Sequence, residues 1–121
     1  MTSEMYVLII GILFMHWVAD FVLQTDWQAK NKSSNNVALL KHVGSYTAVL
    51  FVASLFLFTK TEIAFYWVML NSLLHFATDY VTSRINTYLW NKGDVHNFFV
   101  MIGFDQFIHY VCLFGTLLVL Q

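Results

Sequence analysis

Proline is absent from the 121-residue chain, cysteine occurs once, and charged residues make up only 11% of it. Without proline, nothing in the sequence forces a kink in a helix. The single thiol, Cys112, excludes a disulfide within the chain. Six Lys and Arg stand against seven Asp and Glu, so the chain lacks the basic excess that is typical of nucleic-acid-binding proteins.

Hydrophobic residues dominate what is present: they make up 59% of the chain, and the mean hydropathy is +0.63. These values are typical of membrane proteins rather than of soluble domains. Four apolar runs approach the roughly 20 residues that cross a bilayer, at 5–23, 39–58, 63–81 and 98–120. The predicted fold is therefore one all-α domain over residues 1–121, with four antiparallel transmembrane helices. The segments 26–41, 59–62 and 83–97 are expected to be loops.

The distribution of basic residues predicts the orientation of these spans. The first and third loops contain Lys30, Lys32, Lys41, Arg84 and Lys92, whereas the opposite side has only Lys60. The positive-inside rule places the two basic loops in the cytoplasm and both termini on the non-cytoplasmic side. The first apolar run follows an acidic start with Glu4 and no basic residue, so we expect a retained span rather than a cleaved signal.

Three pairs of histidine and aspartate lie inside the predicted spans, and ionisable groups in lipid are costly and mark functional sites. The pairs are His16 with Asp20, His75 with Asp79, and Asp105 with His109. Members of each pair are four residues apart, which places both on nearly the same helix face, about 6 Å apart along the axis.

The order within each pair reverses when the helix direction reverses. Histidine precedes aspartate in the first and third spans, and aspartate precedes histidine in the fourth. All three aspartates therefore lie nearer the cytoplasm, with the histidines about one turn deeper. His42 enters near the cytoplasmic end of the second span, so each span contributes a histidine to one polar layer.

Imidazoles and carboxylates together are good ligands for a divalent transition metal, with zinc the first choice. Helical bundles build such centres from ligands that project inward. The candidate ligands for one metal ion or two are His16, His42, His75, His109, Asp20, Asp79 and Asp105. In one arrangement the histidines bind the metal and the aspartates accept from the other ring N–H. Two alternatives stay open: the pairs only fix helix packing, or they relay protons without metal.

Three further residues are candidates for supporting roles. Gln24, one turn beyond Asp20, and Gln106, beside Asp105, can hydrogen-bond to the layer. Arg84 can pair with a carboxylate or a phosphate headgroup, or act as a positive-inside anchor.

The chain resembles a family of short bacterial and phage membrane proteins classed as domain of unknown function 3307. The resemblance covers nearly the whole chain and is carried by HWVADFVLQTDWQAKNK at 16–32, LKH at 40–42, LHFATDYVTSR at 74–84 and DQFIH at 105–109. It implies a polytopic protein, most simply of the bacterial inner membrane, and adds Asp26, Lys30 and Arg84 to the pattern. It implies no particular activity.

We expect a metal-dependent membrane hydrolase in which a metal lowers the pKa of its bound water toward ~7. Asp20, Asp79 and Asp105 are the candidate proton acceptors, and Arg84 or loop lysines would hold the anionic headgroup of a lipid-like substrate. The alternatives are a metal-ion or proton transporter component, for which a homo-oligomer could complete the path, and a structural or interaction protein of the bilayer. Nucleic acid is not an expected partner.

Overall fold

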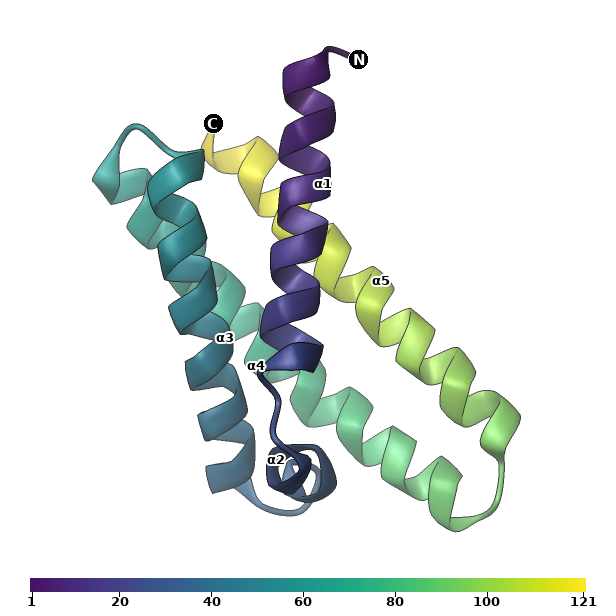
Figure 1. Cartoon of the computed structure of the whole chain (residues 1–121). Helices are drawn as coiled ribbons and strands as arrows, with labels where there is room; N and C mark the ends of the chain where they lie inside the picture. Colours follow the sequence, from purple (N-terminus) through teal and green to yellow (C-terminus); the bar gives the residue numbers. More distant parts are fainter.

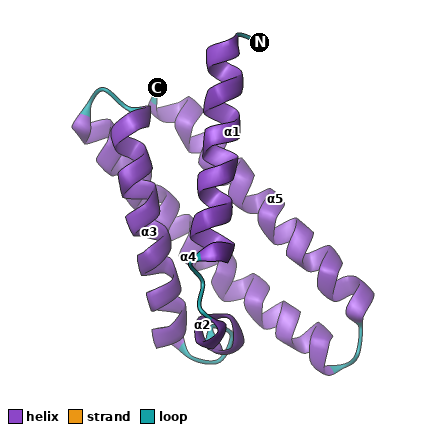
Figure 2. Cartoon of the chain, viewed as in Figure 1, coloured by secondary structure: helices purple, strands orange, loops and turns teal.

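The computed structural model describes residues 1–121, and it contains helices and connecting segments but no strand (Figure 2). The elements are α1 (Ser3–Trp17), a π-helical turn η1 (Val18–Val22), α2 (Asp26–Asn31), α3 (Asn36–Leu57), α4 (Thr61–Asn91) and α5 (Val95–Leu120). The predicted all-α class is confirmed.

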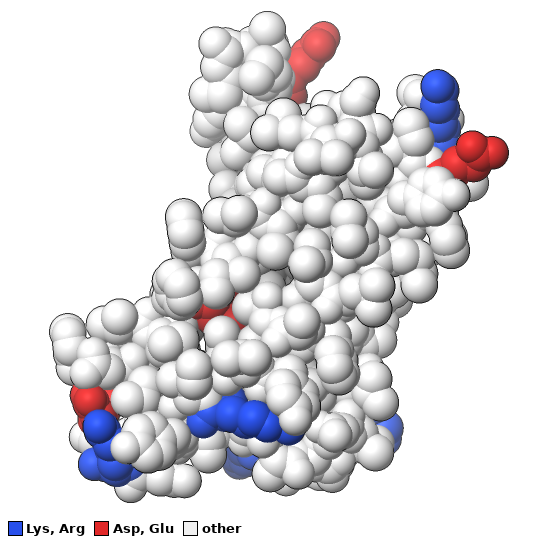
Figure 3. Space-filling model, turned by 180° about the vertical axis from the view of Figure 1, so that it is seen from behind, with Lys and Arg blue, Asp and Glu red and all other residues white.

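The long helices alternate in direction, so both termini lie at one end of the molecule and the short helix α2 lies at the other (Figure 1). α4 packs along both α3 and α5. α1 packs against α3, and α2 packs against the start of α3. We call the end with α2 the basic end, because Lys and Arg gather there (Figure 3).

Three segments are long and apolar enough to cross a membrane: Ser3–Val22, Asn36–Leu57 and Val95–Leu120. This indicates a membrane protein. α4 does not reach the same hydropathy, because its buried face contains polar residues such as Asn71, His75 and Asp79. The fourth span at 63–81 therefore stays a prediction.

An apolar core fills the bundle on the side of the termini. It includes Ile12, Tyr46, Leu50, Trp67 and Leu113, each at most 1% exposed. The Trp67 indole donates to the Leu113 carbonyl at 3.3 Å and so ties α4 to α5. Packing of this kind closes the bundle toward the termini.

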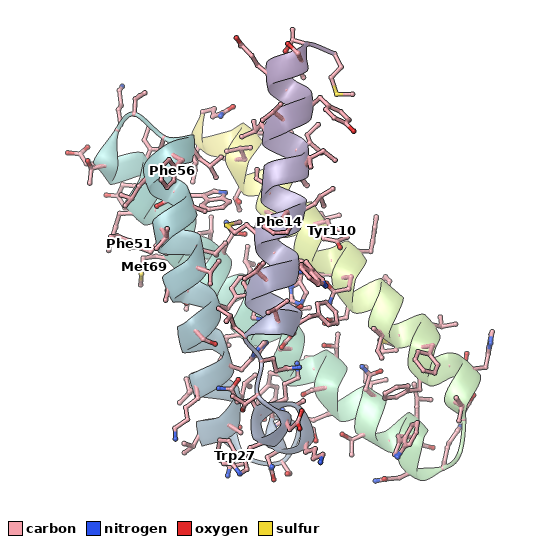
Figure 4. The ribbon with its side chains drawn as sticks, in the orientation of Figure 1. Phe14, Trp27, Phe51, Phe56, Met69 and Tyr110 are labelled. Carbon is pink, nitrogen blue, oxygen red and sulfur yellow. The ribbon has the colours of Figure 1, made fainter.

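Large apolar side chains also cover the outside of the bundle. Phe14, Phe51, Phe56 and Met69 project outward from α1, α3 and α4 (Figure 4). Few charged side chains appear between the two ends of the molecule (Figure 3). An apolar belt of this extent is what a bilayer-embedded surface requires.

The expectation of a loop over 26–41 is wrong. Residues Asp26–Asn31 form α2, and α3 already begins at Asn36. A capping box starts α2, because Thr25 Oγ1 accepts from the Gln28 N–H at 3.2 Å and Gln28 Oε1 accepts from the Thr25 N–H at 3.1 Å. The T-x-x-Q spacing is a known helix-start signal, so this helix could have been read from the sequence.

The expectation of a loop over 83–97 is also wrong. α4 continues to Asn91, and α5 begins at Val95. The connection is a short turn in which Gly93 adopts a φ of 79°, a conformation that favours glycine.

Asp94 caps α5 at the end of this turn. Its carboxylate accepts hydrogen bonds from the Asn97 side chain and from the Asn97 backbone N–H, and these hydrogen bonds lower the pKa of Asp94. The polar residues after Val81 therefore lie beyond the predicted span but still belong to helix α4.

The apolar core predicts a contrast between two leucines of α3. Leu50 is fully buried and Leu55 is 58% exposed. We expect Leu50→Ala to lower the free energy of unfolding by about 2 kcal/mol or more, because it leaves a cavity. Leu55→Ala, the matched control, should have a much smaller effect. Titration of the detergent-solubilised protein with sodium dodecyl sulfate, followed by circular dichroism, measures both; equal losses would contradict the assigned core.

Candidate metal centre

The four long helices bring the candidate His and Asp residues together in the middle of the bundle. His16 and Asp20 come from α1 and η1, His42 from α3, His75 and Asp79 from α4, and Asp105 and His109 from α5. Their exposed fractions range from 0% to 8%. The polar layer that helix alternation predicts is thus present as one buried cluster, which we call the His/Asp cluster.

Asp20 lies in the π-helical turn η1, which follows directly on α1. A π turn widens the helix locally, and such turns are frequent at functional sites. Neither proline nor glycine occurs within Val18–Val22, so no residue of this segment predicts the irregularity.

Four donor atoms in the cluster face a common point. His42 Nε2 lies 3.0 Å from Asp20 Oδ1 and 3.2 Å from Asp79 Oδ2. His75 Nε2 lies 3.5 and 3.4 Å from the same two oxygens, and the two Nε2 atoms are 3.2 Å apart. Zinc bonds to nitrogen and oxygen are about 2.0–2.2 Å long, so the ligands of a tetrahedral site lie roughly 3.3–3.6 Å apart. The observed separations are close to this spacing.

The ring orientations restrict the protons of His42 and His75. Because their Nε2 atoms face each other at 3.2 Å, only one of the two can donate a proton to the other. Neither Nδ1 atom has a hydrogen-bond partner. The carboxylates thus face the same Nε2 atoms that would bind a metal, and they do not accept from the outer ring nitrogens of these two histidines.

His109 approaches the same carboxylates from the side of α5. Its Nε2 atom lies 3.0 Å from Asp79 Oδ1, 3.3 Å from Asp105 Oδ2 and 3.9 Å from Asp20 Oδ2. The Asp105 carboxylate also accepts from the Thr82 hydroxyl at 2.6 Å. Each of the three aspartates is therefore in contact with His109 or near it.

Gln106 has a more central position than its sequence neighbourhood indicates. Its Nε2 donates to Asp20 Oδ2 at 2.9 Å and to Asp105 Oδ2 at 3.1 Å, which leaves Oε1 to accept from His16 Nε2 at 2.7 Å. His16 Nδ1 then accepts from the Tyr46 hydroxyl at 2.9 Å. Both ring nitrogens of His16 are thus engaged, and in this arrangement His16 orients Gln106 rather than offering a free lone pair.

Lys32 is the cation nearest the cluster, although its place in the sequence predicts only a loop lysine. Its Nζ donates to Asp79 Oδ2 at 2.9 Å, and the side chain is 18% exposed. Burial opposes the charged amine, but the carboxylates of Asp79 and Asp20 outweigh it and raise the pKa of Lys32. Lys32 lies just after α2, so the unrecognised helix explains why its position was missed.

Arg84 has different partners. Its guanidinium donates to the Tyr80 carbonyl at 2.8 Å and to Asn36 Oδ1 at 3.3 Å, and it stacks on the Tyr80 ring. Arg84 makes no ion pair with a carboxylate of the cluster. Its contacts place it beside the start of α3.

A cavity of about 680 Å³ opens on one side of the cluster. Asp20, Asp105 and Gln106 belong to its lining, whereas His42 and His75 do not. A hollow with acidic atoms at its base is visible on the surface near the basic end (Figure 3). The cavity therefore gives access to one side of the cluster only.

Polar atoms without partners line the same cavity. Gln24 Oε1, Ser83 Oγ and Asn86 Oδ1 are buried and form no hydrogen bond. Buried polar atoms are nearly always paired with protein, water or ligand. Gln24 thus borders the cavity. Ser83 and Asn86 also line it, and they could not be predicted as lining residues because 83–97 was expected to be a loop.

The family model described as "Protein of unknown function (DUF3307)" matches residues 8–120, which confirms the resemblance drawn from the His and Asp motifs. No curated protein matches the chain, and no solved structure matches it. The comparisons therefore identify the family but no activity, so an activity has to be inferred from the chemistry of the site.

The Lys32–Asp79 ion pair predicts a difference between two neighbouring lysines. In chelator-treated protein, Lys32→Met should lower the free energy of unfolding by about 2 kcal/mol, because it leaves a buried carboxylate without its cation. Lys30 is exposed and forms no ion pair, so Lys30→Met is the matched control and should change stability little. Unfolding in sodium dodecyl sulfate measures both, and equal effects would argue against the ion pair.

Proposed function

The chain belongs to the DUF3307 family, and from the chemistry of its site we propose that it is a membrane-embedded hydrolase. It would use a divalent transition metal, with zinc the first choice, to cleave a phosphoester of a lipid-like substrate. The observation that carries the proposal is the spacing of the four donor atoms of His42, His75, Asp20 and Asp79. Five of the six separations between these atoms lie between 3.0 and 3.5 Å, and all fall within 4.8 Å.

The charge of the cluster supports a bound cation. Asp20, Asp79 and Asp105 can carry three negative charges, whereas Lys32 is the only Lys or Arg that forms an ion pair with them. Unpaired charge in a buried site is costly. Bound divalent metal would offset the remaining negative charge while leaving the histidines neutral, which is the form that binds metal.

Four membrane spans with both termini on the non-cytoplasmic side would fit this arrangement. α4 would be the fourth span, since its polar residues face α3 and α5 and need not meet lipid. The basic end would then lie at the cytoplasmic face of a bacterial inner membrane, which is the location that the family resemblance implies. The cavity would open near that face.

The cavity fits an amphiphilic, anionic substrate. Lys30 and Lys32 line it on one side, and Phe98, Phe99 and Ile102 provide an apolar wall. Lysine is a common ligand of phosphate groups, and an apolar wall would hold an acyl or isoprenoid chain. A phospholipid or prenyl phosphate would thus place its headgroup beside Asp20 and Asp105.

Hydrolysis there would add one water molecule across a P–O bond. The water oxygen would form a bond to phosphorus while the ester P–O bond breaks, and the leaving oxygen would take up the proton that water releases. Asp105 borders the cavity and is not one of the four donors of the proposed centre, so its carboxylate is the candidate to carry that proton. Asp79 would act on the metal side, and a bound divalent cation would supply Lewis acidity.

Transport is the weaker alternative, because the apolar core closes the bundle toward the termini. Trp67, Leu50 and Leu113 are buried there, and the polar bonds beyond the cluster, such as Asn71 Nδ2 to Thr116 Oγ1 at 2.8 Å, join helices locally. A packing role alone does not require two imidazoles and two carboxylates to be gathered at the spacing of metal ligands. Both alternatives can be tested together with the proposal.

Metal content tests the centre itself. We expect the wild type, purified in mild detergent, to contain at least one equivalent of zinc or a related metal by elemental mass spectrometry. His42→Ala and His75→Ala should each lower this content, whereas His96→Ala, on the exposed first turn of α5, should retain it. Circular dichroism checks that each variant is folded. A folded wild type that binds no added zinc, manganese or cobalt would refute the metal centre.

Activity on lipid phosphoesters tests the reaction. Mixed micelles of phosphatidic acid, phosphatidylglycerol or a prenyl phosphate, with phosphatidylcholine as the zwitterionic comparison, should show release of phosphate or headgroup by mass spectrometry. Asp105→Asn should reduce kcat/KM by about 100-fold, the scale of a lost proton-transfer group or ligand. Lys30→Ala should mainly raise KM, and Lys41→Ala, which lies outside the cavity lining, is the control. Metal-loaded protein that hydrolyses none of these substrates would count against the proposed reaction.

A further inference from the structure

We infer that the cluster holds two divalent cations bridged by the carboxylates of Asp20 and Asp79. This inference rests on the metal centre proposed above and concerns the number of ions and their arrangement. It assigns His42 and His75 to one ion, the inner ion. It assigns His109 and Asp105 to the other, the outer ion.

The two oxygens of Asp20 face different histidines. Oδ1 lies 3.0 Å from His42 Nε2 and 3.5 Å from His75 Nε2. Oδ2 instead lies 3.5 Å from His16 Nε2, whose proton Gln106 Oε1 accepts, and 3.9 Å from His109 Nε2. One carboxylate thus presents an oxygen to each of two donor groups, which is the arrangement of a bridging ligand.

Asp79 repeats this division with its oxygens. Oδ2 lies 3.2 Å from His42 Nε2 and 3.4 Å from His75 Nε2. Oδ1 lies 3.0 Å from His109 Nε2. Two carboxylates from η1 and α4 therefore separate the same two groups of histidines, and carboxylate-bridged metal pairs lie about 3.5–4 Å apart.

The outer position has its own remaining ligands. His109 Nε2 and Asp105 Oδ2 are 3.3 Å apart, and donor atoms of Asp20, Asp105 and His109 all lie within 4.8 Å of one another. With Asp79 Oδ1 beside His109, the outer ion would have one nitrogen and three oxygen donors. Helical bundles hold carboxylate-bridged metal pairs with similar ligand sets.

Gln106 marks the outer position in the structure. Its amide nitrogen donates to Asp20 Oδ2 and Asp105 Oδ2, at 2.9 and 3.1 Å. These are two of the four oxygens and nitrogens assigned to the outer ion. The amide therefore holds in place a pair of oxygens that a cation would otherwise bring together, and we expect it to shift when the outer ion binds.

The two positions differ in their access to the cavity. Asp20, Asp105 and Gln106 line it, whereas His42 and His75 do not. Only the outer ion would therefore meet a substrate, and it has one histidine where the inner ion has two. We expect the outer ion to bind more weakly and to exchange first.

The experiment counts ions and measures their coupling. Detergent-purified protein is stripped with chelator, reloaded with Mn²⁺ and analysed by elemental mass spectrometry and electron paramagnetic resonance. We expect two Mn²⁺ per chain and the exchange-coupled spectrum of a bridged pair. Asp105→Asn should reduce the content to one and give the uncoupled six-line signal. Asp94→Asn, at the turn before α5 and outside the cluster, is the matched control.

The outcomes separate this inference from the proposed function. One ion per wild-type chain, or two ions without coupling, would overturn the bridged pair and leave the single metal centre standing. A wild type that binds no ion would overturn both. If Asp105→Asn does not fold, the wild-type count and spectrum still decide the question, and a folded Asp105→Asn protein with two ions would overturn the assignment of Asp105.

Discussion

The structure depends on one constraint: three carboxylates lie buried inside a bundle whose outside is apolar, and their charge has to be balanced there. Imidazoles, one ammonium group, an amide and a hydroxyl meet these carboxylates, and every long helix contributes to the set. Because an uncompensated buried charge costs several kcal/mol, the helices cannot slide relative to one another without losing these contacts. The cluster therefore fixes the register of the bundle as well as forming its site.

The helical class and the meeting of the His and Asp pairs could be predicted from the sequence, because both follow from period and direction. A four-residue spacing keeps His75 and Asp79 on one face, and antiparallel alternation brings Asp105 and His109 to the same level. What could not be predicted was which atoms meet. That depends on how neighbouring helices are rotated, and it decides that Gln106 bridges two carboxylates while Arg84 contacts Tyr80 and Asn36.

The errors in the predicted loops have one cause. The polar residues after Thr25 and after Val81 predict the end of a helix, but in the structure they mark only where the apolar surface ends. In α4 the helix continues past the apolar stretch and carries Ser83 and Asn86 to the cavity. In α2 a capping box restarts a helix that positions Lys32 against Asp79. α2 and the last turns of α4, which both border the access route, were therefore missed for the same reason: a polar segment need not be a loop.

The His/Asp cluster can be reached from one side only, because an apolar core fills the bundle on one side of it and a cavity lies on the other. Toward the termini, buried apolar side chains such as Leu50 and Trp67 leave no polar route. Toward the basic end, the helices diverge around a cavity with unpartnered polar atoms. A site that is sealed on one side and open on the other suits a bound molecule that enters and leaves by the same path. The lysines at that opening would favour an anion, and the apolar wall would favour an anion that is attached to a hydrocarbon chain.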